Sequence, residues 1–255
     1  MKNSSMKDKK LILISIILLS VIWVIISNII DNSIYLPKVN EVVNEILGIF
    51  KEKTFLLDVG YSLFRAIISF LVAAIIAILL GVLSSFSKYI YNFFYPINSI
   101  IKSIPTIAFI LIALIWLNKN SAPYLIGIVI SFPILYETTI NSILNSNNQL
   151  IEMLNVYKVS FKDKLKNFYM QSIFINISQI ATSTFSLAFK VVVAGEVFGQ
   201  PPYGIGTAIQ GAKINFNTAG IFAWIIIVAL LSYILDKIII IVINKALKGG
   251  RYLID

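Results

Sequence analysis

Apolar residues in this chain gather in long runs that alternate with shorter polar intervals. The runs at residues 11–30 and 63–83 are too long and too apolar for helices of a soluble core. Each matches the ~20 residues that a helix needs to cross ~30 Å of hydrocarbon. The chain is therefore predicted to be an all-α integral membrane protein. Six transmembrane helices are expected, over residues 11–30, 58–83, 91–117, 123–144, 168–194 and 219–243.

Proline and glycine predict where these helices bend or stop. Pro96 and Pro105 interrupt the third apolar run, so this helix should be kinked or should follow a short surface helix. Residues 195–217 are rich in Gly and Pro, so we expect the fifth helix to break near Gly195 and no regular helix in the outer excursion that follows. Pro37 precedes an amphipathic helix that should lie at the interface. Its apolar face is formed by Val39, Val43, Ile46 and Phe50.

One polar interval, residues 145–171, is longer than a simple connection requires. Its apolar residues follow a helical spacing and need a partner, either the membrane surface or another protein. They are Leu150, Leu154, Tyr157, Phe161 and Leu165. Ser146 with Gln149, and Ser160 with Asp163, match the capping box that begins a helix. Two short helices with a bend near residues 158–160 are therefore predicted.

Composition and charge narrow the class of protein. Hydrophobic residues make up 58% of the chain and charged residues 13%, and Cys and His are absent. The common zinc and thiol chemistries are thereby excluded, and no catalytic, metal-binding or cofactor-binding residue is predicted. The net charge of +9 is better explained by a membrane protein with basic cytoplasmic loops than by a nucleic-acid partner.

The distribution of Lys and Arg predicts the orientation. An excess lies in the intervals assigned to the cytoplasm, so both termini should be cytoplasmic. These residues are Lys2, Lys7, Lys9, Lys10, Lys88, Lys158, Lys162, Lys164, Lys166, Lys245, Lys248 and Arg251, against Lys38, Lys51, Lys53, Lys119 and Lys213 outside. Residues 1–255 are expected to form one transmembrane domain, with a core over residues 57–243, an N-terminal helix at 11–30 and a cytoplasmic segment at 145–171.

A polar stripe runs down the fifth predicted helix. Its members recur at helical spacing on an otherwise apolar segment: Ser172, Asn176, Gln179, Ser183, Ser186 and Lys190. Unpaired amides and a lysine facing lipid would be costly; a central lysine alone costs about 2.5–3.5 kcal/mol on insertion scales. The stripe must therefore face protein or water. Hydrogen bonding between helices of a bundle or dimer and the wall of a solute path both satisfy this requirement.

Two further features bear on function. Glu137 lies in the fourth predicted helix, where it could pair with a neighbouring helix or mark an ion path. An ion-coupled carrier usually has several carboxylates within its spans, and few are expected here. An ion-coupled secondary transporter or channel acting without an ATPase is therefore the weaker alternative. The glycine-rich stretch after the fifth helix is either a structured outer loop or a gate or docking surface. Its candidate residues are Glu196, Gly199, Gly204 and Gly206.

These segments resemble a known family. Residues 152–171 align with a cytoplasmic motif of E-A-A, three residues, G, nine residues, then I-x-L-P. Glu152 keeps the acid, Met153 and Leu154 replace the alanines, Lys158 replaces the glycine, Phe168 and Met170 stand for Ile and Leu, and Gln171 replaces the proline. Further matches are Ser62-Leu63-Phe64-Arg65, residues 102–108 with Ile115-Trp116, Phe132-Pro133-Ile134, and residues 193–199 with 204–206. The chain resembles a permease subunit of a bacterial type I ABC importer, in the branch for taurine, sulfonate, nitrate and thiamine-precursor pyrimidines.

The resemblance implies partners and roles. Two permease copies would form the path for such a small molecule, and an extracytoplasmic solute-binding protein would deliver it across the bacterial plasma membrane. A dimer of ABC ATPase subunits, which would carry ATP and Mg, would receive the coupling segment. The residues implied in coupling are Glu152, Leu154, Tyr157, Lys158 and Ser160, and the stripe would line the path. The chain has no G-x-x-x-x-G-K-[ST] segment, so it is not expected to be an enzyme itself. Membrane lipid is the remaining expected partner.

Overall fold

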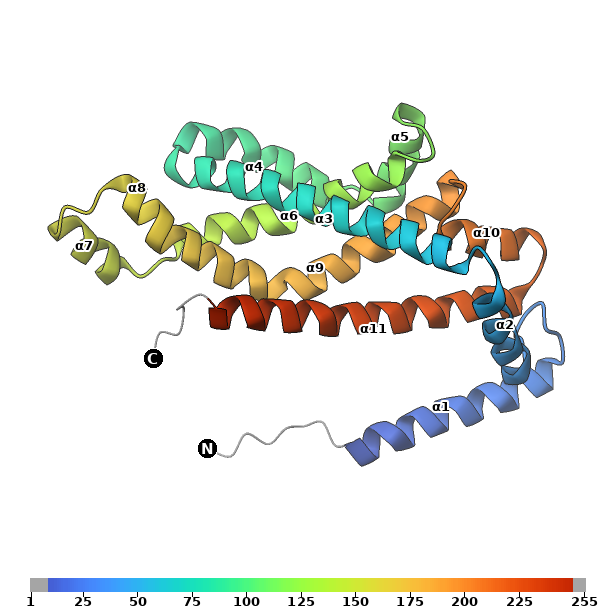
Figure 1. Ribbon diagram of the computed structural model, residues 1–255. Coiled ribbons are helices and arrows are strands. Elements are labelled where there is room, and N and C mark those ends of the chain that lie inside the picture. The colour runs from blue at the N-terminus through green and yellow to red at the C-terminus, as the bar shows by residue number, and fades with distance from the viewer. Residues whose placement is uncertain (1–8, 250–255) are drawn as a thin grey trace.

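The computed structural model describes residues 9–249 (Figure 1). Lys2, Lys7 and Arg251, which entered the orientation prediction, lie outside this range. The described residues form helices and contain no strand. In chain order the helices are α1 (Lys9–Ile30), α2 (Val39–Lys51), α3 (Phe55–Phe86), α4 (Lys88–Ser103), α5 (Thr106–Trp116), α6 (Ala122–Leu144), α7 (Asn148–Val156), α8 (Phe161–Lys164), the π-helix η1 (Leu165–Tyr169), α9 (Met170–Gly199), α10 (Ile205–Ile214) and α11 (Thr218–Gly249).

Five of the six predicted spans are present as long apolar helices, and the third, at residues 91–117, is a bent pair of helices. Within residues 9–249, five helical stretches are long and apolar enough to cross a membrane, and α4 with α5 makes a sixth if the bent pair is one span. These two helices meet at 104°. The break falls at Pro105, which has no N–H to continue the hydrogen-bond ladder. Pro96, by contrast, lies inside an unbroken α4.

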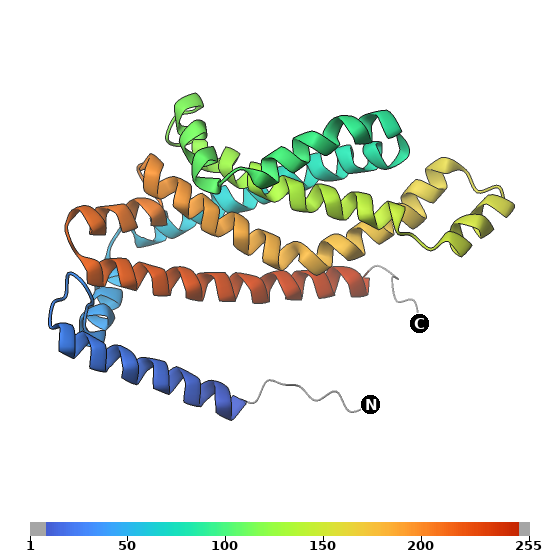
Figure 2. The same cartoon turned by 180° about the vertical axis from the view of Figure 1, so that it is seen from behind.

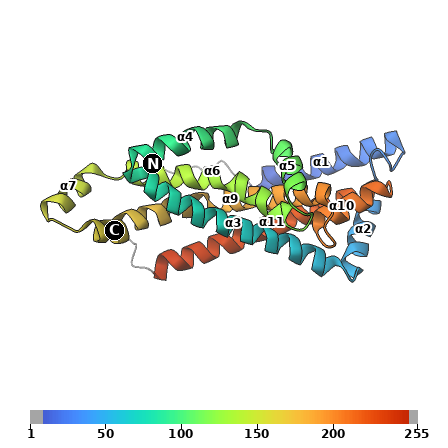
Figure 3. The ribbon, with the colours of Figure 1, turned by 90° about the horizontal axis from the view of Figure 1, so that it is seen from above.

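Three helices, α3, α6 and α9, form the centre of the bundle (Figure 3). Small residues let their backbones approach closely. A Cβ added at Gly81 of α3 would lie 2.7 Å from the side chain of Thr139, and one added at Gly127 of α6 would lie 2.6 Å from that of Ser69. The tight α3–α6 contact therefore depends on glycine at these two positions.

Two connections differ from the predictions. The interval between the second and third predicted spans, residues 84–90, is reduced to Ser87, because α3 continues to Phe86 and the Ser87 hydroxyl caps α4. The predicted break of the fifth helix near Gly195 is wrong, because α9 continues to Gly199 and ends at Gln200 in a left-handed conformation.

The prediction of no regular helix in residues 195–217 is also wrong, because α10 occupies residues 205–214. The prolines and Gly204 all lie in the short turn before α10, so they shape the turn and leave the helix intact. Gly206, in the first turn of α10, permits close packing: a Cβ there would lie 2.2 Å from the carbonyl oxygen of Val193.

Helices α1 and α2 lie at the periphery. In Figures 1 and 2, α1 runs apart from the central helices. It is held near its end by Trp23, whose Nε1–H donates to the Pro37 carbonyl at 3.1 Å. The predicted amphipathic helix is present as α2, but the predicted face is only partly right. Val42 and Ile49 are buried, while Val43 and Phe50 of the predicted face are exposed.

The helix bundle has two opposite ends. Helices α7 and α8 lie at one end, termed the α7 end, while α2 and α10 lie at the other, termed the α10 end (Figure 1). Helix α1 begins, and α11 finishes, on the side toward the α7 end. The described ends of the chain therefore lie on the same side of the bundle. The assignment of this side to the cytoplasm stays a prediction.

Candidate functional site

The polar interval at residues 147–169, termed the elbow, folds as two short helices joined by a sharp turn. Asn147 caps α7, and its side-chain oxygen accepts the N–H groups of Gln149 and Leu150. The predicted cap at Ser146 was therefore wrong by one residue. Helix α7 ends at Val156, and the chain reverses before α8 begins. The prediction of two helices with a bend at residues 158–160 is confirmed.

The turn of the elbow is built on Lys158. Its φ of 53° is left-handed. Its N–H donates to the carbonyl of Asn155, and the N–H of Val159 donates to that of Leu154, both at 3.0 Å. These two bonds form a Schellman motif, which usually has glycine at the left-handed position. Lys158 occupies the position where the motif of the resembled family has glycine, and it adopts the left-handed conformation that glycine favours. This conformation costs about 1–2 kcal/mol for a residue with a Cβ.

Side-chain bonds hold α8 in place. Ser160 Oγ accepts the N–H of Asp163 at 3.2 Å and donates to the Asp163 carboxylate at 2.5 Å. This confirms the second predicted cap. Lys164 Nζ donates to Asn155 Oδ1 at 2.6 Å, which ties α8 back to α7 across the turn.

The elbow is anchored to the end of α3. The ring of Phe86 contacts Phe161 and Tyr169, with centroids 5.0 and 5.3 Å apart. A largely apolar cavity of about 270 Å³ opens between the two arms of the elbow. It is lined by Leu150, Met153, Leu154, Val159, Asp163, Lys164, Asn167 and Phe168.

The predicted coupling residues do not share one surface. Leu154 lines the cavity, whereas Glu152, Lys158 and Ser160 are exposed and Tyr157 is 76% exposed. The single apolar face predicted across the interval is wrong, because the turn at Lys158 separates its two halves. The α7 half faces the cavity between the arms, and Phe161 packs on α3 instead.

A second cavity, of about 350 Å³, lies between α6 and α9 on the side of the α7 end. The α9 wall consists of Ser172, Asn176, Gln179 and Ile180. The α6 wall consists of Thr138, Asn141, Ser142 and Asn145, which the sequence reading missed. Their polar side chains recur at helical spacing, so the same stripe argument applied to this helix would have found them.

The structure shows which residues of the α9 stripe bond to neighbouring helices and which are exposed. Ser172 Oγ donates to the Ser142 carbonyl at 2.9 Å, which joins α9 to α6. Further along, Ser186 Oγ donates to Asp236 of α11 at 3.3 Å. Gln179, Ser183 and Lys190 are exposed on the surface of the described chain. Part of the stripe therefore bonds neighbouring helices, and part faces outward or into a cavity.

Glu137 pairs with a neighbouring helix. Its carboxylate accepts hydrogen bonds from Lys102 Nζ at 2.7 Å and from Asn98 Nδ2 at 2.9 Å, both on α4. The expectation of few carboxylates in the spans needs correction, since the spanning helices also contain Asp58, Glu196 and Asp236. Each of these accepts a hydrogen bond within the fold.

Glu196 is the centre of a buried polar cluster near the α10 end. Its side chain is 0% exposed and that of Arg65 is 4% exposed, with Nη1 and Oε1 2.6 Å apart. Ser62 Oγ donates to the same carboxylate at 2.6 Å, and the N–H of Gly206 donates at 3.1 Å. This cluster joins α3, α9 and α10.

The turn before α10 is held by the same residues of α3. The N–H of Gly204 donates to Asp58 Oδ1 at 2.9 Å, and that of Ile205 donates to Ser62 Oγ at 2.8 Å. Arg65 Nη1 also donates to the Tyr203 carbonyl at 2.8 Å. The candidate outer residues Glu196, Gly204 and Gly206 thus come together in a fixed connection, while Gly199 packs separately, near Leu114 and Lys119.

The sequence reading did not single out Asp58 as a partner of the turn before α10, or Ser62 as a partner of Glu196. The signal was present, because Asp58, Ser62, Arg65 and Ser69 recur at 4-3-4 spacing on an apolar helix. Within residues 9–249, no group of three Asp or Glu side chains is placed to share a metal ion.

Comparison with known proteins gives a consistent result. The family described as "Binding-protein-dependent transport system inner membrane component" matches residues 73–248. A putative aliphatic sulfonates transport permease protein of Bacillus subtilis (strain 168) is 25% identical over 189 residues, which cover 73% of this chain and 68% of the relative. A putative ABC transporter permease protein of Methanocaldococcus jannaschii is 27% identical over 223 residues, covering 85% and 83%. A nitrate import permease protein of Synechocystis sp. is 28% identical over 183 residues, covering 70% and 65%.

Proposed function

This chain belongs to the family of inner membrane components of binding-protein-dependent transport systems, as an ABC importer permease of the sulfonate and nitrate branch, and we propose that two copies of it form the path for a small oxyanion. In this proposal the α7 end faces the cytoplasm of a bacterial cell and carries the elbow. The α10 end faces outside and meets an extracytoplasmic binding protein. ATP and Mg are held by two separate ATPase subunits.

The turn at Lys158 is the observation that carries the coupling role. It gives the elbow a defined shape at the position of the family's cytoplasmic motif, although most of the motif's residues have changed. Exposed apolar side chains lie outside the cavity between the arms, among them Val156 and Tyr157. In the proposed complex these residues dock on an ATPase subunit, and ATP binding draws the two elbows together.

The polar cavity between α6 and α9 is the observation that supports the proposed solute path. Amide and hydroxyl groups line it, and one of them, Gln179, is also exposed on the surface of the described chain. In lipid, such groups without partners would be costly. A second copy placed against this face would enclose a water-filled passage, which relative movement of the two copies would open to either side.

The solute class is supported by two relatives, which are named for aliphatic sulfonates and for nitrate. Both solutes are oxyanions. On this chain Lys190 places an exposed ammonium on the stripe of α9, where it would attract an anion. Taurine belongs to the same chemical class, whereas a thiamine-precursor pyrimidine does not and would be accepted only if the path is less selective than proposed.

The test is uptake by cells that produce this permease with its ATPase and binding protein. Glu152→Arg and Leu154→Arg are expected to abolish uptake and ATPase association while the protein still inserts. Lys88→Glu, an exposed charge reversal at the same end but outside the elbow, is the matched control and should leave both unchanged. Wild-type uptake in the elbow variants would refute the docking role. Uptake that persists without any ATPase would establish a secondary transporter or channel instead.

A further inference from the structure

A cavity of about 380 Å³, termed the tyrosine cavity, lies at the α10 end. Its walls come from the first half of α3, from the start of α6 with the turn before it, and from the turn before α10. The lining residues that matter below are Tyr61, Arg65, Asn120, Ser121, Tyr124 and Tyr203. Small-molecule sites usually have volumes of ~300–1,000 Å³, so a small solute fits this space.

Arg65 gives the tyrosine cavity a positive wall. It is the one charged side chain among the described residues that line the cavity. Its partner Glu196 is 0% exposed and does not line the cavity, so a solute there meets the guanidinium and not the carboxylate. The cavity therefore favours an anion over a cation.

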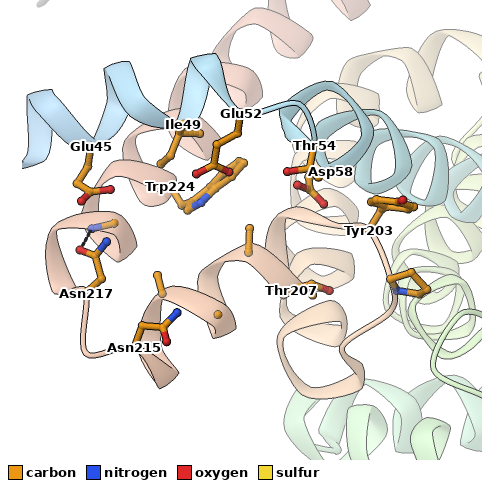
Figure 4. A pocket seen from close by; sticks show the side chains of 15 residues that line it. Glu45, Ile49, Glu52, Thr54, Asp58, Tyr203, Thr207, Asn215, Asn217 and Trp224 are labelled. Atoms are coloured by element: carbon orange, nitrogen blue, oxygen red, sulfur yellow. Dashed lines mark hydrogen bonds between the residues drawn. The ribbon is translucent and has the colours of Figure 1, made fainter.

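A neighbouring cavity at the same end has the opposite character. It has a volume of about 350 Å³ and shares Pro202 and Tyr203 with the tyrosine cavity. Figure 4 shows this neighbour, with the carboxylates of Glu45, Glu52 and Asp58 around the space. Like charges repel, so an anion is disfavoured in this space and is expected in the tyrosine cavity instead.

An independent observation indicates that the ligand carries acceptor oxygens. The Arg65 guanidinium has five N–H donors. Nη1 makes both of its bonds, to Glu196 Oε1 at 2.6 Å and to the Tyr203 carbonyl at 2.8 Å. Nε is enclosed and has no hydrogen-bond partner among the described residues, although Arg65 is only 3% exposed. Buried donors are normally paired, so the unpaired Nε calls for an acceptor.

The edge of the guanidinium formed by Nε and Nη2 selects the kind of anion. Neither atom donates to a described residue. Two N–H groups side by side match two oxygens of one oxyanion. The hydroxyls of Tyr61, Ser121 and Tyr124 also line the cavity and donate to no other described residue, so they are available to further oxygens of the same ligand.

The tyrosine rings disfavour a flat aromatic solute. Tyr61 stacks on Tyr203 with ring centroids 5.6 Å apart and planes at 20°. The guanidinium carbon of Arg65 lies 5.6 Å from the centroid of the Tyr61 ring. A pyrimidine would have to displace one of these contacts in order to stack on Tyr61, whereas a small oxyanion needs only the free edge of Arg65.

We propose that the tyrosine cavity binds a small oxyanion, such as a sulfonate or nitrate, at the Nε–Nη2 edge of Arg65. This inference rests on the proposed function for the class of solute and for the outward direction of the α10 end. It adds a solute site separate from the polar cavity between α6 and α9. Because Nη1 alone bonds to Glu196, the anion binds with the buried ion pair intact and finds the guanidinium already positioned.

The test is hydrogen exchange of the permease–ATPase complex in nanodiscs, titrated with sodium methanesulfonate in the absence of a binding protein. A ligand that binds only the closed form slows exchange by a factor of one plus the ratio of its concentration to its Kd. At about nine times the half-saturating concentration, exchange at residues 121–124 and 203–206 should therefore be about tenfold slower. Sodium chloride at the same ionic strength should not protect these residues, because chloride has no pair of oxygens for the two N–H groups.

Two matched variants locate the site. Asn120→Asp places a carboxylate on the wall of the tyrosine cavity and should raise the half-saturating concentration about tenfold or more. Asn215→Asp makes the same change at an exposed position of the neighbouring cavity (Figure 4) and should leave the concentration unchanged. Arg65→Lys retains a positive charge beside Glu196 but lacks the Nε–Nη2 edge, so it should lose the protection.

The phosphate of a lipid headgroup has the same oxyanion chemistry as the solute. The titration is therefore repeated in dodecyl maltoside micelles, which contain no phosphate, and the half-saturating concentration should be the same. Protection in micelles that is absent in nanodiscs would assign the site to lipid and overturn the proposal. Equal protection by chloride, or wild-type protection in Asn120→Asp, would also overturn it. Methanesulfonate uptake is measured in parallel, and its absence with protection intact would count against the proposed function and not against this site.

Discussion

Because Arg65 and Glu196 form a buried ion pair, replacing one oxygen of the Glu196 carboxylate by an amide nitrogen should strongly destabilise the contact between α3, α9 and α10. Glu196→Gln keeps the side-chain shape and removes the negative charge. The guanidinium of Arg65, 4% exposed, is then left without its counterion. Breaking a buried pair in this way costs about 3–5 kcal/mol. The bonds from Ser62 and Gly206 to the former carboxylate are also weakened, because bonds to a charged acceptor are stronger than bonds to a neutral one.

Hydrogen exchange at the start of α10 measures this cost directly. The N–H groups of Gly204, Ile205 and Gly206 all donate into the cluster, so they exchange when the turn opens. A loss of about 3–5 kcal/mol corresponds to roughly a hundredfold to several thousandfold faster exchange. The measurement is made on the permease in nanodiscs, comparing wild type with Glu196→Gln.

A second variant separates charge pairing from packing. Arg65→Met combined with Glu196→Gln removes both charges, so it should recover much of the protection that the single variant loses. Asp31→Asn, which removes an exposed pair with Lys38, should leave exchange at residues 204–206 unchanged. Wild-type exchange in Glu196→Gln would refute the claim that this pair holds α10. A double variant that exchanges faster than the single one would refute the charge explanation.

Three further changes have defined outcomes. Lys158→Gly should slow hydrogen exchange at the elbow about twofold to fivefold. Glycine relieves the left-handed strain of about 1–2 kcal/mol, and its greater conformational entropy in the unfolded chain offsets part of this gain. Faster exchange would contradict the Schellman assignment. Gly206→Ala should lower the melting temperature, because its Cβ would collide with the Val193 carbonyl, whereas Gly211→Ala, with nothing within 4 Å, should not. Gln179→Leu should impair uptake without releasing the ATPase, and unchanged uptake would remove Gln179 from the path.

Features encoded by local periodicity were predictable from the sequence. Long apolar runs predicted the spans, because a helix that crosses lipid must be apolar over its whole length. Pro105 predicted the break between α4 and α5. The location of the elbow and its cap at Ser160 also followed from nearby residues. These features depend on contacts within a few positions of each other, so the pattern along the chain contains the information.

The sequence was less informative where composition and packing disagree. Glycine and proline between residues 195 and 217 argued against regular helix, yet α10 forms because the prolines lie in the turn before it. Gly206 is present for close approach to the α9 backbone rather than for flexibility. Only the packed structure distinguishes a glycine that ends a helix from one that lets two helices touch.

The sequence by itself determined the class of protein, most of the spans and the position of the elbow. The tertiary structure decided which residues act together. Arg65 and Glu196 are separated by 131 positions, and Asp58 and Gly204 by 146. The walls of the polar cavity come from different helices, as do those of the tyrosine cavity. The periodicity of residues along one helix does not specify such pairings. They arise only when small residues allow two helices to pack closely and bring polar side chains of both into contact.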